Sequence, residues 1–227
     1  MKQRTTPGTD TLEPAVCGQI TAAEIAYRRL REMIVTGVLD PGEVINEQEL
    51  VERLGIGRTP VREAIQRLRW QHLMTVFPRR GLAIAKLGLE DIHAIFETRQ
   101  VVEQRTAELA AVRADLDEAA VLVELARRLD DTARTQNHQR FLPLDYELHL
   151  GIARASRNAL LAESAEQLLT LSTWAWHRYF RLRGSLPSDF LEHSELARAI
   201  GERDAERAGR LMVAHVRLSH DLVRSVS

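Results

Sequence analysis

The chain has 227 residues, of which 44% are hydrophobic and 28% are charged, and its formal net charge is −1. These values exclude a disordered chain and leave room for one large domain or two small ones. Because no run of about 18 apolar residues and no apolar N-terminal core are present, we expect neither a membrane span nor a signal peptide. Cys17 is the only cysteine, which allows no disulfide within one chain and suits the cytoplasm.

The charge is distributed unevenly along the chain. Residues 1–86 carry a net charge of +3, whereas residues 87–227 carry −4. Seven arginines and a single acidic residue, Glu63, lie between positions 53 and 80. This concentration indicates a polyanionic partner, although a basic run without further pattern is usually a solvated surface.

The N-terminal part begins with a Pro-, Gly- and Thr-rich stretch, residues 1–18, which we expect to be a disordered arm. A helix is then predicted over 19–37, with a capping box at Thr21 and Glu24 and a stop at Gly37. The sequence LDPGEVI predicts a turn. Asn46 follows as the cap of a short second helix, which the sequence GIG ends.

A third helix is expected to restart at Thr59 and Pro60, since the missing N–H of proline costs nothing in a first helical turn. Two short strands, LMTVF and LAIA, follow and are joined by PRRG. Two helices across a short glycine-containing turn form a helix-turn-helix, and the hairpin makes it winged. Residues 19–86 therefore predict a winged helix-turn-helix domain that binds double-stranded DNA.

The third helix has an apolar face and a separate polar face. The N-terminal part of such a helix enters the major groove, where arginine can bind guanine through two hydrogen bonds. The hairpin tip can reach phosphates or the minor groove. The candidate DNA-binding residues are Arg58, Thr59, Arg62 and Gln66 on the helix, and Arg79, Arg80 and Gly81 at the tip.

From Gly88 onward the pattern is almost entirely helical, so we expect residues 87–227 to form an antiparallel helical bundle and the fold class to be mainly α. The predicted helices are 89–113, 115–136, 143–156, 158–183, 188–200 and 204–225. Four polar residues occupy positions on apolar helical stripes, namely Asp145, His149, His193 and His215. The other five histidines, at 72, 93, 138, 177 and 220, show no such pattern.

Two of these histidines can be placed relative to each other. At ~1.5 Å per residue, His193 and His215 lie roughly 12 and 16 Å from a turn at 201–204, at similar heights on antiparallel helices. Three imidazoles and one carboxylate suit Zn²⁺, or else nickel or another transition metal. The alternative is a set of hydrogen-bonded core histidines with one salt bridge between Asp145 and His149.

Arg99 is a further polar residue on an inward face, level with Ile95 and Val102. One interpretation is that its guanidinium binds the carboxylate of an effector through a bidentate pair of hydrogen bonds. The other is an ion pair with Glu103 or with an acid on another helix. The sequence leaves both open.

The stretch EQELVERLGIGRTPVREAIQRLRWQHLMTVFPRRGLAI, residues 47–84, resembles the N-terminal domain of the GntR family of bacterial transcription regulators. The motifs RTPVREA, RL and PRRG carry the resemblance. It implies DNA contacts at Arg58, Thr59, Arg62, Arg80 and Gly81, and the preceding helix adds Gln48 as a weaker candidate. This sequence departs from the family at Gly57, usually Ser or Thr, and at QHL in place of EGL.

Residues 89–222 resemble the FCD effector domain of the FadR-type branch of that family. The matching pieces are Arg99 with Glu103, DYELH, ASRNAL, the EH at 192–193 and GERDAERAGRLMVAHV. In metal-containing members an Asp and three His hold one ion, and they map onto Asp145, His149, His193 and His215. Asn158 matches a family Asn, which we interpret as a helix cap.

Together these features predict a homodimeric repressor that binds an inverted-repeat operator and responds to a small carboxylic acid bound beside a divalent metal. One alternative is a metal-dependent enzyme fused to a DNA-binding domain, although its candidate bases, Glu103, Glu147 and His177, lie in no catalytic motif. A second alternative is a metal-free regulator that binds an acyl-type ligand.

Overall fold

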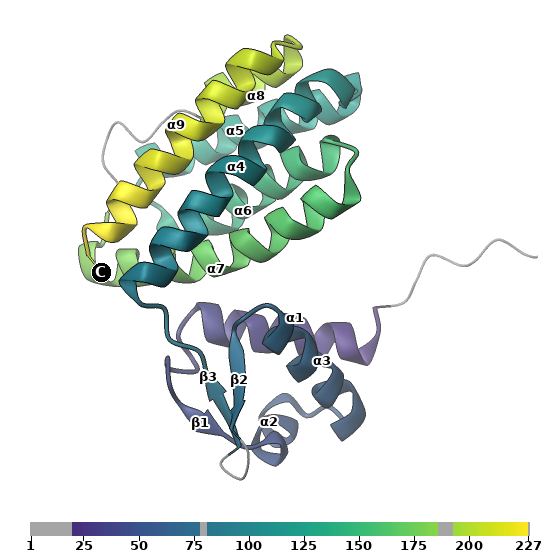
Figure 1. The fold of residues 1–227 in the computed structure, drawn as a ribbon, viewed down its shortest axis with the longest axis vertical. Coiled ribbons are helices and arrows are strands. Elements are labelled where there is room, and N and C mark those ends of the chain that lie inside the picture. Colours follow the sequence, from purple (N-terminus) through teal and green to yellow (C-terminus); the bar gives the residue numbers. More distant parts are fainter. Residues whose placement is uncertain (1–19, 78–80, 186–192, 227) are drawn as a thin grey trace, which may run out of the picture.

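The computed structural model describes residues 20–77, 81–185 and 193–226. A small N-terminal domain of helices and short strands lies next to a bundle of longer helices (Figure 1). The predicted arm over 1–18 and the wing arginines Arg79 and Arg80 lie outside the described residues. None of the helices in the described ranges combines the length and apolar character needed to cross a membrane.

The N-terminal domain contains the predicted helix-turn-helix. Its elements are α1 (Ala22–Val35), β1 (Val44–Ile45), α2 (Glu47–Leu54), α3 (Arg58–Trp70), β2 (Met74–Phe77) and β3 (Gly81–Ile84). Thr21 caps α1 by accepting the backbone N–H of Glu24 at 3.1 Å, and Asn46 caps α2 by accepting that of Glu49 at 2.9 Å. Local capping therefore determines where these two helices begin.

The sheet has one strand more than the sequence analysis predicts. The segment LDPGEVI, expected to be a turn, contains β1, and the strand order is β1-β3-β2 with antiparallel pairing throughout. Val44 pairs with Ala83 and Ile45 with Leu82. A two-residue strand has no periodicity of its own, so this long-range pairing leaves no local signal. Gly81 adopts φ +97°, and a Cβ there would lie 3.1 Å from the carbonyl oxygen of Ile45.

In its described residues, the C-terminal domain consists of helices and the short turns that join them. Its elements are α4 (Leu89–Arg113), α5 (Leu116–Arg134), α6 (His138–Ala155), α7 (Ala159–Arg183), α8 (His193–Gly201) and α9 (Ala205–Arg224). Helices α4 and α9 run side by side along the bundle (Figure 1). Residues 188–192 of the helix predicted over 188–200 lie outside the described residues.

Helix α6 begins earlier than predicted. We expect it from Pro143, yet it starts at His138, with Asn137 as its cap and Pro143 inside it. Proline inside a helix costs on the order of 3 kcal/mol because one backbone hydrogen bond is lost. The preceding turn places Phe141 in the core, fully buried, with its ring edge-on to those of Trp176 and Phe180. This packing of an aromatic side chain offsets the cost of the proline.

The two domains contact each other directly. Arg31 of α1 donates a 2.9 Å hydrogen bond to the hydroxyl of Tyr146 on α6, and its guanidinium lies 5.0 Å from the centre of that ring. Helix α1 also packs against α7. The N-terminal domain is thus held against the helices α6 and α7 of the bundle.

Candidate metal centre and DNA-reading surface

The bundle interior gathers the four polar residues that the sequence analysis selects. Asp145 and His149 lie one turn apart on α6, His193 is the first residue of α8, and His215 lies on α9. All four side chains are buried. The rings of His193 and His215 are 4.7 Å apart, centre to centre, and those of His149 and His215 are 5.0 Å apart. Residues 70 positions apart in sequence thus share one small volume of the core.

The spacing of their donor atoms fits a metal ion. His149 Nε2 lies 3.2 Å from His215 Nε2 and 3.6 Å from Asp145 Oδ1. Ligands bound at ~2.0–2.2 Å in tetrahedral or octahedral geometry are roughly 3.0–3.5 Å apart. Donor atoms of Asp145, His149 and His215 all lie within 4.8 Å of one another. His193 falls outside that mutual limit, but its Nε2 is 3.6 Å from Asp145 Oδ1.

Two buried carboxylates orient the histidine rings. Glu103 Oε2 lies 2.5 Å from Nδ1 of His149, and Asp130 Oδ1 lies 3.0 Å from Nδ1 of His193. When Nδ1 bonds to a carboxylate, Nε2 is the atom left to bind a metal, and its basicity is raised. In both rings Nε2 is the atom that points toward Asp145. The chemistry of the donor set therefore fits a divalent ion.

Asp130 is a functional candidate that the sequence analysis misses. Besides His193 it accepts the backbone N–H of Ser194 at 3.2 Å and the hydroxyl of Ser194. Burial alone would raise the pKa of Asp130, but the hydrogen bonds from His193 and Ser194 lower it. The one available signal is that Asp130 follows Leu129 on the buried stripe of α5. Its partner lies 63 residues away, so no spacing rule connects them.

The electrostatics of the cluster keep the acids charged and one histidine neutral. Burial would raise the pKa of Asp145, but the charges of His149 and His193 and a hydrogen bond with His193 lower it. Burial, together with the nearby charges of His193, His149 and Arg99, holds the pKa of His215 well below its usual value. Metal ligands must be deprotonated carboxylates and neutral imidazoles, and the shifts of Asp145 and His215 favour these forms. Burial would lower the pKa of His193, but its hydrogen bonds with Asp130 and Asp145 raise it, so a metal ion has to displace a proton from that ring.

Arg99 forms the ion pair that was one of its two interpretations. Its guanidinium bonds to both carboxylate oxygens of Glu103, through Nε and, at 3.3 Å, through Nη2. Both side chains are 1% exposed. Burial opposes ionisation, yet Arg99 and His149 lower the pKa of Glu103 to about 2. The guanidinium of Arg99 thus already has an anionic partner. Its burial alone therefore gives no reason to expect a bound anion beside it.

His220 differs from what the sequence analysis expects. The sequence analysis places His220 on no apolar stripe, but the residue is buried, with 9% of its surface exposed. Its ring centre lies 5.3 Å from those of both Phe96 and His93. Burial lowers the pKa of His220. It shares α9 with His215 but packs against a different part of α4.

The candidate DNA-reading residues lie on an exposed face. Arg58, Thr59, Arg62 and Gln66 of α3 are all exposed, as is Gln48 of α2, and Gly81 is half-buried at the start of β3. Arg62 forms a bidentate ion pair with Glu47, in which Nη2 donates to Oε1 at 2.8 Å and Nε donates to Oε2 at 3.1 Å. Arg58 donates to Gln48 at 2.7 Å. Residues of α2 therefore hold both arginine side chains, and the sequence analysis does not single out Glu47, the partner of Arg62.

Part of the arginine-rich stretch is engaged elsewhere. Arg67 pairs with Glu24 at 2.6 Å and stacks on Tyr27, with its guanidinium 3.6 Å from the ring centre. Arg53 pairs with Glu49 at 2.6 Å on its own helix. These two charges stabilise the domain itself. The surface that can face a polyanion is accordingly narrower than the charge count suggests.

Comparisons with known proteins agree with this architecture. Residues 22–84 match the gntR family of bacterial regulatory proteins, and residues 94–218 match the FCD domain. The chain is 27% identical to the HTH-type transcriptional regulator YdhC of Bacillus subtilis, covering 86% of this chain and 87% of that relative. It is 26% identical to the Nta operon transcriptional regulator of Aminobacter aminovorans, covering 86% and 90%.

A third relative is the HTH-type transcriptional repressor GlaR of Escherichia coli, 27% identical over 84% of this chain and 90% of that protein. The solved structure of E. coli McbR/YncC superposes with a TM-score of 0.78 at 23% identity, covering 91% of this chain and 99% of that one. The chain therefore belongs to the GntR family of bacterial transcription regulators and carries an FCD effector domain. These families and relatives are regulators of transcription, not enzymes.

Proposed function

We propose that this regulator is a cytoplasmic homodimer that represses transcription from an inverted-repeat operator. A small carboxylic acid, bound beside a divalent metal, changes its operator affinity. The observation that carries the proposal is the buried Asp/His cluster, with two histidines oriented by carboxylates, in a chain whose other domain presents a helix-turn-helix. Residues 19–86 would bind DNA, and residues 87–227 would bind the effector and form the dimer.

The metal would be held by Asp145, His149, His193 and His215. Nitrogen and carboxylate donors in this ratio suit zinc, and nickel or another transition metal is the alternative. When bound, the ion supplies positive charge and one or two open positions that a carboxylate oxygen can fill. This donor set in the effector domain favours a small acid over a metal-free site for an acyl-type ligand.

Arg99 would contact the same effector. Its Nε and Nη2 bond to Glu103, and within the described part of the chain no bond is made by Nη1. Its charge acts on Asp145 and His215, so the guanidinium lies near the cluster. We propose that Nη1 donates to a carboxylate oxygen of the effector while Glu103 holds the guanidinium in place.

The operator would be read by the exposed face of α3 and by the wing. Because Arg62 and Arg58 are the longest donors on that face, they would contact base edges in the major groove. The complete set of proposed DNA contacts is Gln48, Arg58, Thr59, Arg62, Gln66, Arg79, Arg80 and Gly81.

The first expected result concerns the oligomeric state. One winged domain covers only a few base pairs, whereas two of them match half-sites about one helical turn, roughly 34 Å, apart. Light scattering at operator-binding concentrations should therefore give the mass of two chains, and shortening the half-site spacing by half a turn should abolish tight binding. A monomer at these concentrations would contradict the proposal.

The second expected result concerns the effector. Calorimetry with sugar acids, dicarboxylates and hydroxy acids should find a ligand that binds metal-loaded wild type and loses at least about tenfold in affinity after metal removal. Arg99→Lys keeps a positive charge beside Glu103 but loses the planar fork, so it should weaken the same acid by a similar factor. If the acids bind all three proteins equally, this role for the cluster is wrong.

A further inference from the structure

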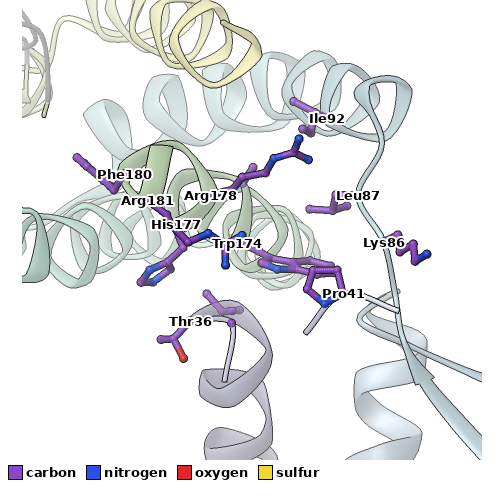
Figure 2. A pocket seen from close by; sticks show the side chains of 13 residues that line it. Thr36, Pro41, Lys86, Leu87, Ile92, Trp174, His177, Arg178, Phe180 and Arg181 are labelled. Atoms are coloured by element: carbon purple, nitrogen blue, oxygen red, sulfur yellow. The ribbon is translucent and has the colours of Figure 1, made fainter. Parts of the chain in front are cut away.

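A second cavity lies at the junction of the two domains, away from the Asp/His cluster. It has a volume of about 460 Å³ and is lined by the end of α1, the segment after it, the linker at 86–87, and helices α4 and α7. Figure 2 shows side chains of α7, among them Trp174 and Arg178, above Thr36, with Leu87 and Lys86 of the linker at the right. None of its lining residues belongs to the candidate metal centre.

The cavity is positively charged and has an apolar floor. Lys86, Arg178 and Arg181 line it together with His177, and no acidic residue is among the lining residues. Within the part of the chain that the structure describes, none of the three cations forms an ion pair. Among the described residues, most ion-paired arginines pair with an acid a few positions away in the sequence, and these three cations do not.

Both domains contribute to the charged walls. Nη1 of Arg181, on α7, lies 3.4 Å from where a Cβ of Gly37 would stand, and Gly37 belongs to the turn after α1. The side chain of Lys86, in the linker, lies over Gly42, close enough that a Cβ there would collide with it. The apolar part is formed by Trp174, Ile92 and Phe180.

We propose that this cavity is a binding site for an organic anion with a flat apolar body, separate from the metal-dependent effector site. Of the residues that the structure describes, three cations and no acid line this space, so an anion bound there meets favourable charge from more than one side. A volume of this size lies in the range of pockets for small molecules, roughly 300–1,000 Å³. Trp174, which is 6% exposed, contributes an apolar edge to the wall, and the guanidinium groups bind the anionic group of the ligand in a directed way.

Occupancy of this cavity affects DNA binding because its walls belong to both domains. A ligand that touches α7, the linker and the turn after α1 favours one placement of the winged domain over others. The factor by which this ligand changes the affinity for operator must equal the factor by which operator changes the affinity for the ligand. The cavity is therefore a second effector site that changes operator affinity.

The test uses naphthalenesulfonate as probe, since a sulfonate is a poor metal ligand, and naphthalenemethanol as its neutral counterpart. Calorimetry on the full-length protein should show the sulfonate binding wild type at least about tenfold more tightly than the alcohol. The double variant Arg178→Gln/Arg181→Gln should lose at least about tenfold in affinity for the sulfonate. Lys86→Gln, an exposed position in the linker, should weaken it in the same direction.

Two controls separate this site from the surface and from the metal centre. Arg183→Gln, on the same helix but not lining the cavity, should change the affinity by less than about twofold. His215→Ala should bind naphthalenesulfonate like wild type and show the same change in operator affinity when the probe is saturating. Equal binding of the sulfonate and the alcohol, or wild-type affinity in the double variant, would overturn the proposal. Loss of the carboxylate response in His215→Ala bears only on the metal centre.

Discussion

Replacing His215 with alanine should remove the bound metal and lower the melting temperature. Wild type is expected to purify with about one divalent ion per chain, because the four side chains form a single donor set. A ligand present at 100 times its Kd stabilises the native state by about 2.7 kcal/mol. For a chain of this size that corresponds to a loss of roughly 5–10 °C when the metal no longer binds. Elemental analysis and thermal unfolding measure the two effects.

The matched control is His220→Ala on the same helix. His220 is also buried, but it packs on Phe96 and His93 and not on the cluster. His220→Ala should leave the metal content unchanged and lower the melting temperature only through lost packing. Treatment with a chelator should then lower the melting temperature of His220→Ala by the same further amount as in wild type. Equal metal content in wild type and His215→Ala would refute the ligand assignment.

Arg62→Ala should reduce operator affinity roughly 5- to 150-fold, which corresponds to about 1–3 kcal/mol for a base contact. The Arg62 side chain is 64% exposed on α3, and its guanidinium pairs with Glu47 at the surface. Replacing it should therefore barely change the free energy of unfolding. Arg58→Ala should act similarly, since Arg58 lies on the same exposed face and donates a hydrogen bond to Gln48 of α2. Fluorescence anisotropy with operator and with unrelated DNA measures the change, and the unrelated DNA should lose far less.

Arg127→Ala is the control for charge. It removes the same charge from an exposed position of α5, where Arg127 pairs with Glu124 and Asp131. Operator affinity should stay within about twofold of wild type. If Arg62→Ala and Arg127→Ala bind operator equally well, α3 is not the helix that reads the operator.

Local features of the chain allowed much of the fold to be predicted. The caps at Thr21, Asn46 and Asn158 accept the backbone N–H groups expected of them, and α4 spans the predicted residues 89–113. What could not be predicted depends on distant partners. Strand β1 exists only through pairing with β3, and the early start of α6 depends on the aromatic neighbours of Phe141.

The candidate site shows the same division. Asp145 and His149 are one helical turn apart, and His193 and His215 are placed together by a tight turn between α8 and α9, so their proximity follows from periodicity. Glu103 and Asp130, which orient two of the rings, contact histidines 46 and 63 residues away. No rule of spacing links such pairs, and only the packed bundle brings them together.

The central claim is that an acid bound at the metal centre controls the DNA-binding domain. The most direct measurement is operator affinity, with and without the best acid from calorimetry, for metal-loaded wild type and His215→Ala. Allosteric coupling of about 1–3 kcal/mol predicts a change of about 5- to 150-fold in wild type and none in His215→Ala. An unchanged operator affinity in wild type, or the same change in both proteins, would contradict the account.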